Sequence, residues 1–529
     1  MNLPQSTEIL MQNVLELSME MLDVLIDIES AGIKISNDKL TRIKLEYQNE
    51  YNSLYNDLMA IAERVMGDTP INLDSPDDRS ILLYSRKVVD KQAWKSAFNI
   101  GTEIRGNTKK QKNKTKMQRP AFNALVKELA PVVRRTSGIS CSHCNGIGSF
   151  YYTLKSGERS KNKKKCSRCR GVGIHYKHLK EPAGLRVIPR GPEDTASGGF
   201  KTDKETLTQI RLDLEGDARE FVDKYMRYSM IRTYLNTFVD SLEKYQDDNG
   251  FIHPQFNQCV TATGRLSSSR PNFQNMPRGN TFPAREAIIS RHEGGYILEG
   301  DYSQLEFRVA GFLSKDPVIY EEVTAGYDVH AYTASIMGVS RQDAKAHTFK
   351  PLYGGMLGNN REMAYYAAFR NKYQAVSEWH DRLQEEAVTT KKVVLPSGRE
   401  YSFPYAKYTR RGTAVGATAI KNYPVQGFAT ADLLPLALIR LHKTLKAMTT
   451  IKPKSKIINT VHDSIVMDVH PDEKSQMVKL MRESMLCIPN ECKLKFGVDF
   501  DMPIDIELKI GHDWLNLQEI RLDEYRNED

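Results

Sequence analysis

The sequence predicts an α+β protein of several domains with a separate cysteine-rich segment. Short apolar runs at residues 296–298 and 457–461 are followed by Asp301 and Asp463, as expected for buried strands that present a carboxylate at an exposed edge. Apolar residues at steps of three and four over residues 10–28 predict an amphipathic helix of about 22–25 residues. Four of the seven cysteines form two CxxC pairs and mark the separate segment.

Length and composition indicate a soluble chain with a polyanionic partner. The 529 residues can form several hydrophobic cores, and contents of 40% hydrophobic and 27% charged residues are typical of globular proteins. A net charge of +9 favours association with a polyanion. No apolar run approaches the ~20 residues of a membrane-spanning helix, and the first residues resemble neither a signal nor a transit peptide. We therefore expect a cytoplasmic protein without a membrane partner.

The chain begins with the helix at residues 10–28, which has a start signal at Ser6 and Thr7 and a stop signal at Gly32. Beyond residue 100, a polar tract with few apolar residues predicts a flexible basic loop. This loop is either merely solvated or a non-specific phosphate contact, which would make binding steeply salt-dependent. Its lysines are Lys109, Lys110, Lys112, Lys114 and Lys116.

Two repeats of the form CxxCxGxG follow the basic loop. Thiolates three residues apart can bind one ion from a tight turn, and the glycines allow the backbone to turn beneath the sulfurs. Four sulfurs form a closed tetrahedral site, so we predict one structural Zn²⁺. His143 is an alternative ligand that four cysteines make unnecessary. The predicted ligands are Cys141, Cys144, Cys166 and Cys169.

Basic residues flank this zinc ribbon, which is therefore either an insertion that binds DNA or a partner protein, or a purely structural clip. The repeats resemble the cysteine-rich region of DnaJ chaperones, which indicates an origin for the knuckles and not a chaperone activity. The flanking residues are Lys161, Lys163, Lys164, Lys165, Arg168 and Arg170.

Two strand-end aspartates can hold a pair of Mg²⁺ ions, and a metal pair about 3.5–4 Å apart stabilises the attacking and leaving oxygens of a phosphoryl transfer. An aspartate at a strand end is common, however, so a structural role is the alternative for Asp301 or Asp463 taken alone.

A second group of candidate residues is spaced by four. On one helix this set covers a stripe about 120° wide, and two cations followed by two aromatic rings suit a bound nucleotide. Pro351 lies inside the stripe, so we predict a kink or a tightened turn between His347 and Pro351. The set is Arg341, Lys345, Phe349 and Tyr353.

Five motifs occur in the order found in family A DNA polymerases, the DNA polymerase I-like enzymes, and the chain resembles that family except for an insertion near residues 100–200. The motifs are TATGRLSSSRPNFQNMP at 261–277, DYSQLEFR at 301–308, RQDAKAHTFKPLYGG at 341–355, NYPVQGFATAD at 422–432 and VHDS at 461–464.

The resemblance implies a right-hand polymerase fold with the four-cysteine zinc ribbon inserted in the thumb region. The expected domains are the thumb base and first part of the thumb at 1–100, the basic insertion with the ribbon at 101–199, thumb helices at 200–256, the first part of the palm at 257–325, the fingers at 326–445 and the second part of the palm at 446–529.

The implied activity is template-directed addition of dNTPs to a primer 3′-hydroxyl, with two Mg²⁺ ions held by Asp301, Asp463 and the Tyr302 carbonyl. Arg341 and Lys345 would bind the triphosphate, and Lys345 would also protonate the departing pyrophosphate. The other implied dNTP contacts are Phe349, Tyr353, His330 and Glu306, which would exclude ribonucleotides. The implied primer–template contacts are Arg265, Asn272, Gln274, Asn422, Gln426 and His462.

The start of the chain resembles the entrance to the polymerase domain, so we expect no 3′–5′ exonuclease domain in this chain. A separate exonuclease or replisome protein that docks on the zinc ribbon would then be a partner. A compact polymerase of this kind would suit a phage, and its location would be the host cytoplasm.

Ser464 stands where most relatives have a second acid, so we expect that acid to be dispensable. A single-subunit RNA polymerase or a reverse transcriptase on the same fold is one rival function, and Glu306 argues against it. A non-enzymatic DNA-binding module with a degenerate polymerase hand is the other, and the intact aspartates and triphosphate cations argue against that.

Overall fold

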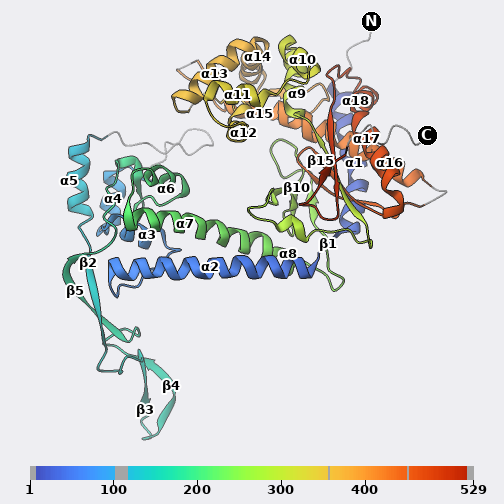
Figure 1. Cartoon of the computed structure of the whole chain (residues 1–529). Helices are drawn as coiled ribbons and strands as arrows, with labels where there is room; N and C mark the ends of the chain where they lie inside the picture. The colour runs from blue at the N-terminus through green and yellow to red at the C-terminus, as the bar shows by residue number, and fades with distance from the viewer. Residues whose placement is uncertain (1–6, 102–116, 356–357, 411, 449–451, 521–529) are drawn as a thin grey trace. The chain divides into compact units, whose positions relative to one another are not determined.

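The chain forms two compact units in the computed structural model (Figure 1). Unit 1 contains Met1–Lys44 and Asn236–Asp529, and unit 2 contains Leu45–Leu235. The structure describes residues 7–101, 117–355, 358–410, 412–448 and 452–520, without the side chains of residues 7–11, 342, 345 and 346. The basic loop predicted at residues 109–116 lies outside the described residues. Among the described helices, none is long and apolar enough to cross a membrane.

The centre of unit 1 is an antiparallel sheet of five strands in the order β14-β15-β11-β16-β17. The predicted hairpin is confirmed: β14 and β15 are joined by a two-residue turn, and His462 adopts a positive φ of 59° there. The strands are β11 (Tyr296–Tyr302), β14 (Lys456–Val461), β15 (Ser464–Val469), β16 (Ile506–Gly511) and β17 (Gln518–Glu519).

Packing determines which face of β11 carries Asp301. A Cβ atom at Gly300 would lie 2.5 Å from Met485 Sδ on helix α17 (Lys474–Leu486), and the hydroxyl of Tyr302 donates to the Met485 carbonyl over 2.8 Å. Gly300 and Tyr302 therefore face α17. Because side chains alternate along a strand, Asp301 faces the opposite side of the sheet.

The predicted N-terminal helix is confirmed as α1 (Thr7–Ala31), which ends before Gly32 at a φ of 66°. One face of the helix belongs to the main core of unit 1, through Leu17, Met21, Val24, Leu25 and Ile28. The helix contacts β14 and helix α16 (Leu434–Ala447). The remaining elements of unit 1 before β11 are β1 (Ile33–Lys34), α8 (Asp240–Lys244), β8 (Phe251–Ile252), β9 (Gln255–Asn257), β10 (Ser267–Ser269), η3 (Phe273–Asn275) and η4 (Ala284–Ala287).

A mostly helical segment follows β11, and its helices α11 to α14 lie together in Figure 1. The elements of this segment are α9 (Leu305–Ser314), α10 (Pro317–Thr324), α11 (Val329–Met337), α12 (Arg341–Thr348), α13 (Asn360–Lys372), α14 (Gln374–Thr390), β12 (Lys392–Val394), β13 (Glu400–Ser402), α15 (Ala417–Gly427) and the π-helical η5 (Phe428–Leu433). Short η6 (Pro471–Glu473) and α18 (Ile488–Phe496) complete unit 1.

Helix α12 corrects the prediction of one continuous stripe. The helix ends at Thr348, so Phe349 is its C-cap and Tyr353 lies in the following turn. Pro351 has no amide hydrogen to continue the helix, and a proline disfavours helical backbone at the residue before it. The chain instead forms tight turns in which the Lys350 amide donates to the His347 carbonyl over 3.1 Å. The expected tightened turn is therefore present.

Unit 2 is a helical body with a second core, whose largest fully buried side chains include Trp94, Phe122 and Phe221. Helix α2 begins in unit 1 and continues into unit 2. The elements are α2 (Asn37–Met66), α3 (Pro76–Tyr84), α4 (Lys91–Ala97), α5 (Arg119–Leu129), η1 (Pro192–Asp194), β6 (Thr195–Ala196), β7 (Gly199–Phe200), α6 (Lys204–Arg211), α7 (Gly216–Tyr234) and the π-helical η2 (Leu235–Val239), which crosses back to unit 1.

A β-structured arm, residues 134–182, extends from the helical body of unit 2. Strand β2 (Arg134–Ser140) pairs with β5 (Ile174–Pro182), and β3 (Ser149–Thr153) pairs with β4 (Arg159–Lys165) (Figure 1). The base of the arm is attached to the body because the Gly138 amide donates to Asp68 Oδ2 over 2.5 Å and the hydroxyls of Thr69 and Thr136 lie 2.7 Å apart.

Candidate active site and cysteine cluster

Asp301 and Asp463, far apart in the sequence, meet where β11 ends and where β14 turns into β15. Asp301 on β11 is the register partner of Ser464 on β15, and the Tyr302 amide donates to the Asp463 carbonyl over 3.4 Å. Oδ1 of Asp301 is buried and, within the described part of the chain, has no hydrogen-bond partner. Arg278 Nη1 lies 3.9 Å from Asp301 Oδ2 and is half exposed.

The two carboxyl groups have perturbed acidities. Burial, followed by repulsion from Asp463, raises the pKa of Asp301 to about 7. Burial, followed by the charge of Glu306, raises the pKa of Asp463. Like charges held together in a partly buried site favour a bound cation, and carboxylate oxygens are the ligands that Mg²⁺ prefers. The donor set and the unpartnered oxygen of Asp301 therefore fit a hard divalent cation.

Two neighbours of the aspartates have their side chains committed elsewhere. Ser464 is fully buried, and its hydroxyl donates to the Val461 carbonyl over 3.1 Å inside the hairpin. The phenol of Tyr302 is on the α17 side of the sheet. Tyr302 can therefore contribute only backbone atoms on the Asp301 side.

Glu306, on the first turn of α9, brings two other candidate residues together. The hydroxyl of Tyr353 donates to Glu306 Oε2, and Arg265 Nη2 lies 3.9 Å from Glu306 Oε1. Burial raises the pKa of Glu306. Tyr353 thus reaches Glu306 from the turn after α12 and not from the helix itself.

Arg341, His330 and Phe349 form a second group around α11 and α12. Arg341 Nε donates to Asp328 Oδ2 over 2.6 Å, so this cation is paired with the N-cap residue of α11. His330 Nδ1 lies 3.0 Å from the Thr348 hydroxyl, and its ring is edge-on to Phe349 at 5.3 Å. Lys345 lies on the same helix, one turn beyond Arg341, and its side chain is outside the described atoms.

Three of the predicted primer–template contacts lie around one small pocket. Arg265, Gln274 and His462 line it, and Gln274 Nε2 donates to the Thr460 carbonyl over 3.4 Å. Asn272 does not present a free amide oxygen, because its Oδ1 accepts from the Gln274 amide and from the Ser268 hydroxyl.

Asn422 and Gln426 lie together, one turn apart, on α15. Oδ1 of Asn422 is buried without a hydrogen-bond partner among the described residues. A buried amide oxygen without a partner costs about 1–3 kcal/mol, so it suits a ligand that donates a hydrogen bond.

Arg278 and Arg285 lie near Asp301 and His462, and the sequence interpretation did not include them. Partial burial, followed by the charges of Arg265, Arg278 and Arg285, lowers the pKa of His462 to about 4, so the imidazole is neutral at pH 7. Arg285 is buried 3.9 Å from the Trp514 ring. The only sequence signal was that these two arginines follow shortly after the motif at 261–277.

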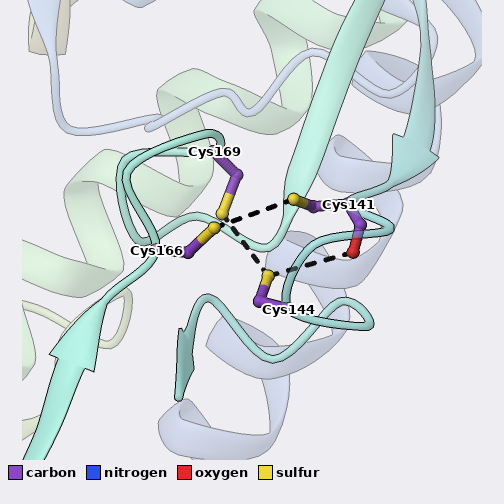
Figure 2. A group of neighbouring side chains, drawn as sticks. All are labelled: Cys141, Cys144, Cys166 and Cys169. Atoms are coloured by element: carbon purple, nitrogen blue, oxygen red, sulfur yellow. Dashed lines mark hydrogen bonds between the residues drawn. The ribbon is translucent and has the colours of Figure 1, made fainter. Parts of the chain in front are cut away.

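The four cysteines of the repeats form one buried cluster in the arm (Figure 2). The Sγ atoms of Cys141 and Cys166 are 3.8 Å apart, and those of Cys144 and Cys169 are 3.6 Å apart. Four sulfurs around a zinc ion at about 2.3 Å would be separated by about 3.8 Å. The cluster therefore has the dimensions of a tetrahedral metal site, and the predicted set of four cysteines is confirmed as a cluster.

The two knuckles of this cluster are related by a local pseudo-symmetry. The Cys141 amide donates to the Gly173 carbonyl and the Cys166 amide donates to the Gly148 carbonyl, both over 2.8 Å. Gly148 and Gly173 also donate to Cys144 Sγ and Cys169 Sγ over 3.3 and 3.2 Å. Each repeat therefore holds the first cysteine of the other repeat and the second cysteine of its own.

Comparisons with known proteins agree with this architecture. The family model of DNA polymerase family A matches residues 177–516. The thermostable DNA polymerase I of Thermus thermophilus is 31% identical over 342 residues, which are 60% of this chain and 39% of the relative. DNA polymerase I of Aquifex aeolicus is 29% identical over 344 residues, 60% of this chain and 54% of the relative. The chain thus spans about two-fifths to half of the length of these relatives.

The fold is also similar to a solved structure, the POL domain of Pol1 from M. smegmatis in complex with DNA primer-template and dNTP. The TM-score is 0.63 at 19% identity, and the match covers 94% of this chain and 70% of that chain. This likeness confirms the predicted α+β, right-hand polymerase fold. The family match covers well over half of the chain, and the chain therefore belongs to DNA polymerase family A.

Proposed function

We propose that the chain is a template-directed DNA polymerase that adds dNTPs to a primer 3′-hydroxyl. The observation that carries this proposal is the meeting of Asp301, on β11, and Asp463, in the turn between β14 and β15, with one carboxylate oxygen buried and unpartnered among the described residues. Family membership supports the same activity, as does the primer-template and dNTP complex of the M. smegmatis domain.

Asp301, Asp463 and the Tyr302 carbonyl would hold two Mg²⁺ ions. When bound, the ions activate the attacking hydroxyl and stabilise charge on the transferring phosphoryl group. The register of β11 with β15 and β16 positions Asp301, and the tight two-residue turn between β14 and β15 positions Asp463. Such preorganisation avoids a rearrangement cost during the reaction.

The dNTP would bind between the α9 and α12 regions. Arg341 would have to exchange its Asp328 partner for the triphosphate, and Lys345, one turn further on, would be the second cation and the proton donor to pyrophosphate. Phe349 and His330 would contact the nucleotide, and the Tyr353–Glu306 pair would close the space beside the sugar C2′. This arrangement favours deoxyribonucleotides.

The primer–template would contact two groups of polar side chains. Arg265, Gln274 and His462 would grip the minor groove near the primer terminus, where the acceptors of all base pairs are similar. Asn422 and Gln426 on α15, with Asn272 in a supporting role, would contact the template.

The resemblance to family A DNA polymerases also suggests which polymerase subdomains the two units contain. We assign unit 2 mainly to the thumb and its insertion, the central sheet of unit 1 to the palm, and the helical segment between β11 and β14 to the fingers. The cysteine cluster would hold one structural Zn²⁺, because it is buried, has tetrahedral dimensions and offers only sulfur ligands.

Primer extension on a DNA template with Mg²⁺ tests the proposal. We expect extension with dNTPs and not with rNTPs, and no trimming of a mismatched 3′ end. Asp463→Asn should abolish extension, whereas the matched control Asp472→Asn, at a side chain that is 83% exposed, should retain it. A zinc-loaded protein that binds the duplex and extends nothing would refute the proposal. Extension with rNTPs would instead identify an RNA polymerase.

A further inference from the structure

The positive charge of the chain is concentrated in the arm. Residues 134–182 contain twelve Lys and Arg and only two Glu, a formal charge of +10, whereas the whole chain carries +9. The other 480 residues together are therefore close to neutral. Four thiolates on one Zn²⁺ would remove only two charges. Eleven of the twelve basic side chains are exposed.

The helical body of the same unit differs in how its cations are compensated. Seven of its described arginines and lysines pair with an acid on another element, whereas no basic side chain of the arm forms an ion pair with any described residue. The pairs in the body are Arg64–Asp217, Lys91–Asp77, Arg190–Asp213, Arg211–Asp223, Lys224–Asp57, Arg227–Glu50 and Arg232–Asp74.

The β3–β4 hairpin has two different faces. Phe150 packs against the cysteine cluster, so its face is turned towards the metal site. Tyr151 is the register partner of Lys163 and lies on the opposite face, as does Lys165, two residues further on. The Tyr151 ring holds Arg159 at 4.2 Å and Lys163 at 5.1 Å. We call Tyr151, Arg159, Lys163 and Lys165 the free face.

Like charges gathered this closely repel one another, because residues two apart on a strand are separated by about 7 Å, within the Debye length of about 8 Å at physiological salt. No acid of the described chain forms an ion pair with these cations, and the phosphates of a polyanion could. A protein partner is a poorer fit, because the core of a protein interface is depleted in lysine and the one ring of the free face is covered by cations.

We propose that the free face binds the sugar–phosphate backbone of DNA and is a second DNA contact, formed by residues other than those of the active site. The choice of DNA as the polyanion rests on the proposed polymerase function. Contact is through charge and not through base edges, so it is independent of sequence and sensitive to salt. The metal site fixes the hairpin that presents these cations.

The test is the salt dependence of DNA affinity in a charge-neutralised variant. Arg159→Gln/Lys163→Gln/Lys165→Gln removes three charges from the free face. The matched control Lys315→Gln/Lys443→Gln/Lys493→Gln removes three charges from unit 1, at side chains that are 64–65% exposed and that each have an acid neighbour. The probes are a fluorescent primer–template hairpin and a fluorescent oligo(dT).

We expect the slope of log K against log salt to fall by up to about 2.7 on the duplex, or about 2.1 on the single strand, in the free-face variant. The control variant should retain the parent slope on both probes. A fall on the duplex alone identifies duplex as the ligand, and a fall on oligo(dT) alone identifies single-stranded DNA. Unchanged slopes on both probes, in protein with one zinc per chain, overturn the inference and leave a separate exonuclease or replisome protein as the occupant of the ribbon.

The inference and the proposed function fail in different ways. A free-face variant that loses slope, from a parent protein that extends no primer, would refute the polymerase function and keep the DNA contact. Asp463→Asn should lose extension and retain the slope. A parent protein that extends primers, with a free-face variant of unchanged slope, would refute only the second contact.

Discussion

Alanine at Gly173 should weaken zinc binding far more than alanine at Gly171. Both glycines are in the second knuckle and have positive φ values, 82° and 90°. A Cβ atom at Gly173 would lie 2.1 Å from the carbonyl oxygen of Gly146 in the first knuckle. A Cβ atom at Gly171 would have its nearest contact at 3.4 Å, with Lys165 Cδ. The two substitutions therefore share the backbone strain and differ in the clash.

The difference between the two variants can be estimated from these geometries. Left-handed backbone costs a residue with a side chain about 1–2 kcal/mol, and both variants incur this cost. Overpacking against a neighbour that cannot move costs about 1–3 kcal/mol more, and Gly146 cannot move freely because its own amide is bonded to the Cys141 carbonyl over 3.1 Å. Gly173→Ala should therefore bind zinc about 5–150-fold more weakly than Gly171→Ala.

Competition with a zinc chelator measures this ratio directly. Each purified variant is titrated with a chromogenic chelator at fixed pH, and the fraction of protein-bound zinc gives the relative affinities. Equal affinities for the two variants would refute the reasoning, since the clash between the knuckles would then have no energetic consequence.

Three further predictions concern unit 1. Arg399→Met should lower the free energy of unfolding, measured by urea denaturation, by about 3–5 kcal/mol. The substitution leaves the fully buried Asp432 carboxylate without the arginine that donates to it over 2.8 Å. A loss below about 1 kcal/mol would contradict this reasoning. Burial lowers the pKa of His380 to about 3, so below pH ~6.5 the unfolded chain binds a proton that the native state does not. The stability of the parent protein should thus fall by up to about 1.4 kcal/mol per pH unit between about pH 6.5 and 3, and the fall should be shallower in His380→Gln; parallel pH profiles would argue against it. Glu306→Ala should raise the ratio of rNTP to dNTP incorporation by about 10–200-fold, the range of discrimination that a small change in pocket size gives. Tyr353→Phe keeps the Glu306 carboxylate and should change this ratio less. Equal ratios in the two variants would show that Glu306 does not exclude ribonucleotides.

The local elements of the active site could be predicted from the sequence because their signals are local. An apolar run followed by an acid predicted β11 and the β14–β15 hairpin, and a helical period with flanking Ser, Thr and Gly predicted α1. The two CxxCxGxG repeats predicted the cysteine cluster for the same reason, since the spacing within each repeat is sufficient to form a knuckle.

The contacts between distant segments could not be predicted. No local pattern reveals that Arg278 lies beside Asp301, or that Arg341 is paired with Asp328, because these contacts depend on how the elements pack. The four residues of the stripe do not share one helix, because α12 ends at Thr348, and Pro351 was the local signal that predicted the tightened turn there. The charge contrast between the arm and the helical body also depends on ion pairs that only the fold brings together.

The register between β11 and β15 has a consequence for the order in which the protein is made. Asp301 and Asp463 are 162 positions apart, and β11 and β15, which pair beside them, become neighbours only when the whole helical segment between them has been synthesised. Contacts between residues so far apart in the sequence form late, because closing the long loop costs entropy before the strand pairing can stabilise the chain. A chain that is still on the ribosome before Val469 emerges can have a folded unit 2, including the arm, but it has no paired aspartates. Catalytic competence would therefore be acquired in one late step.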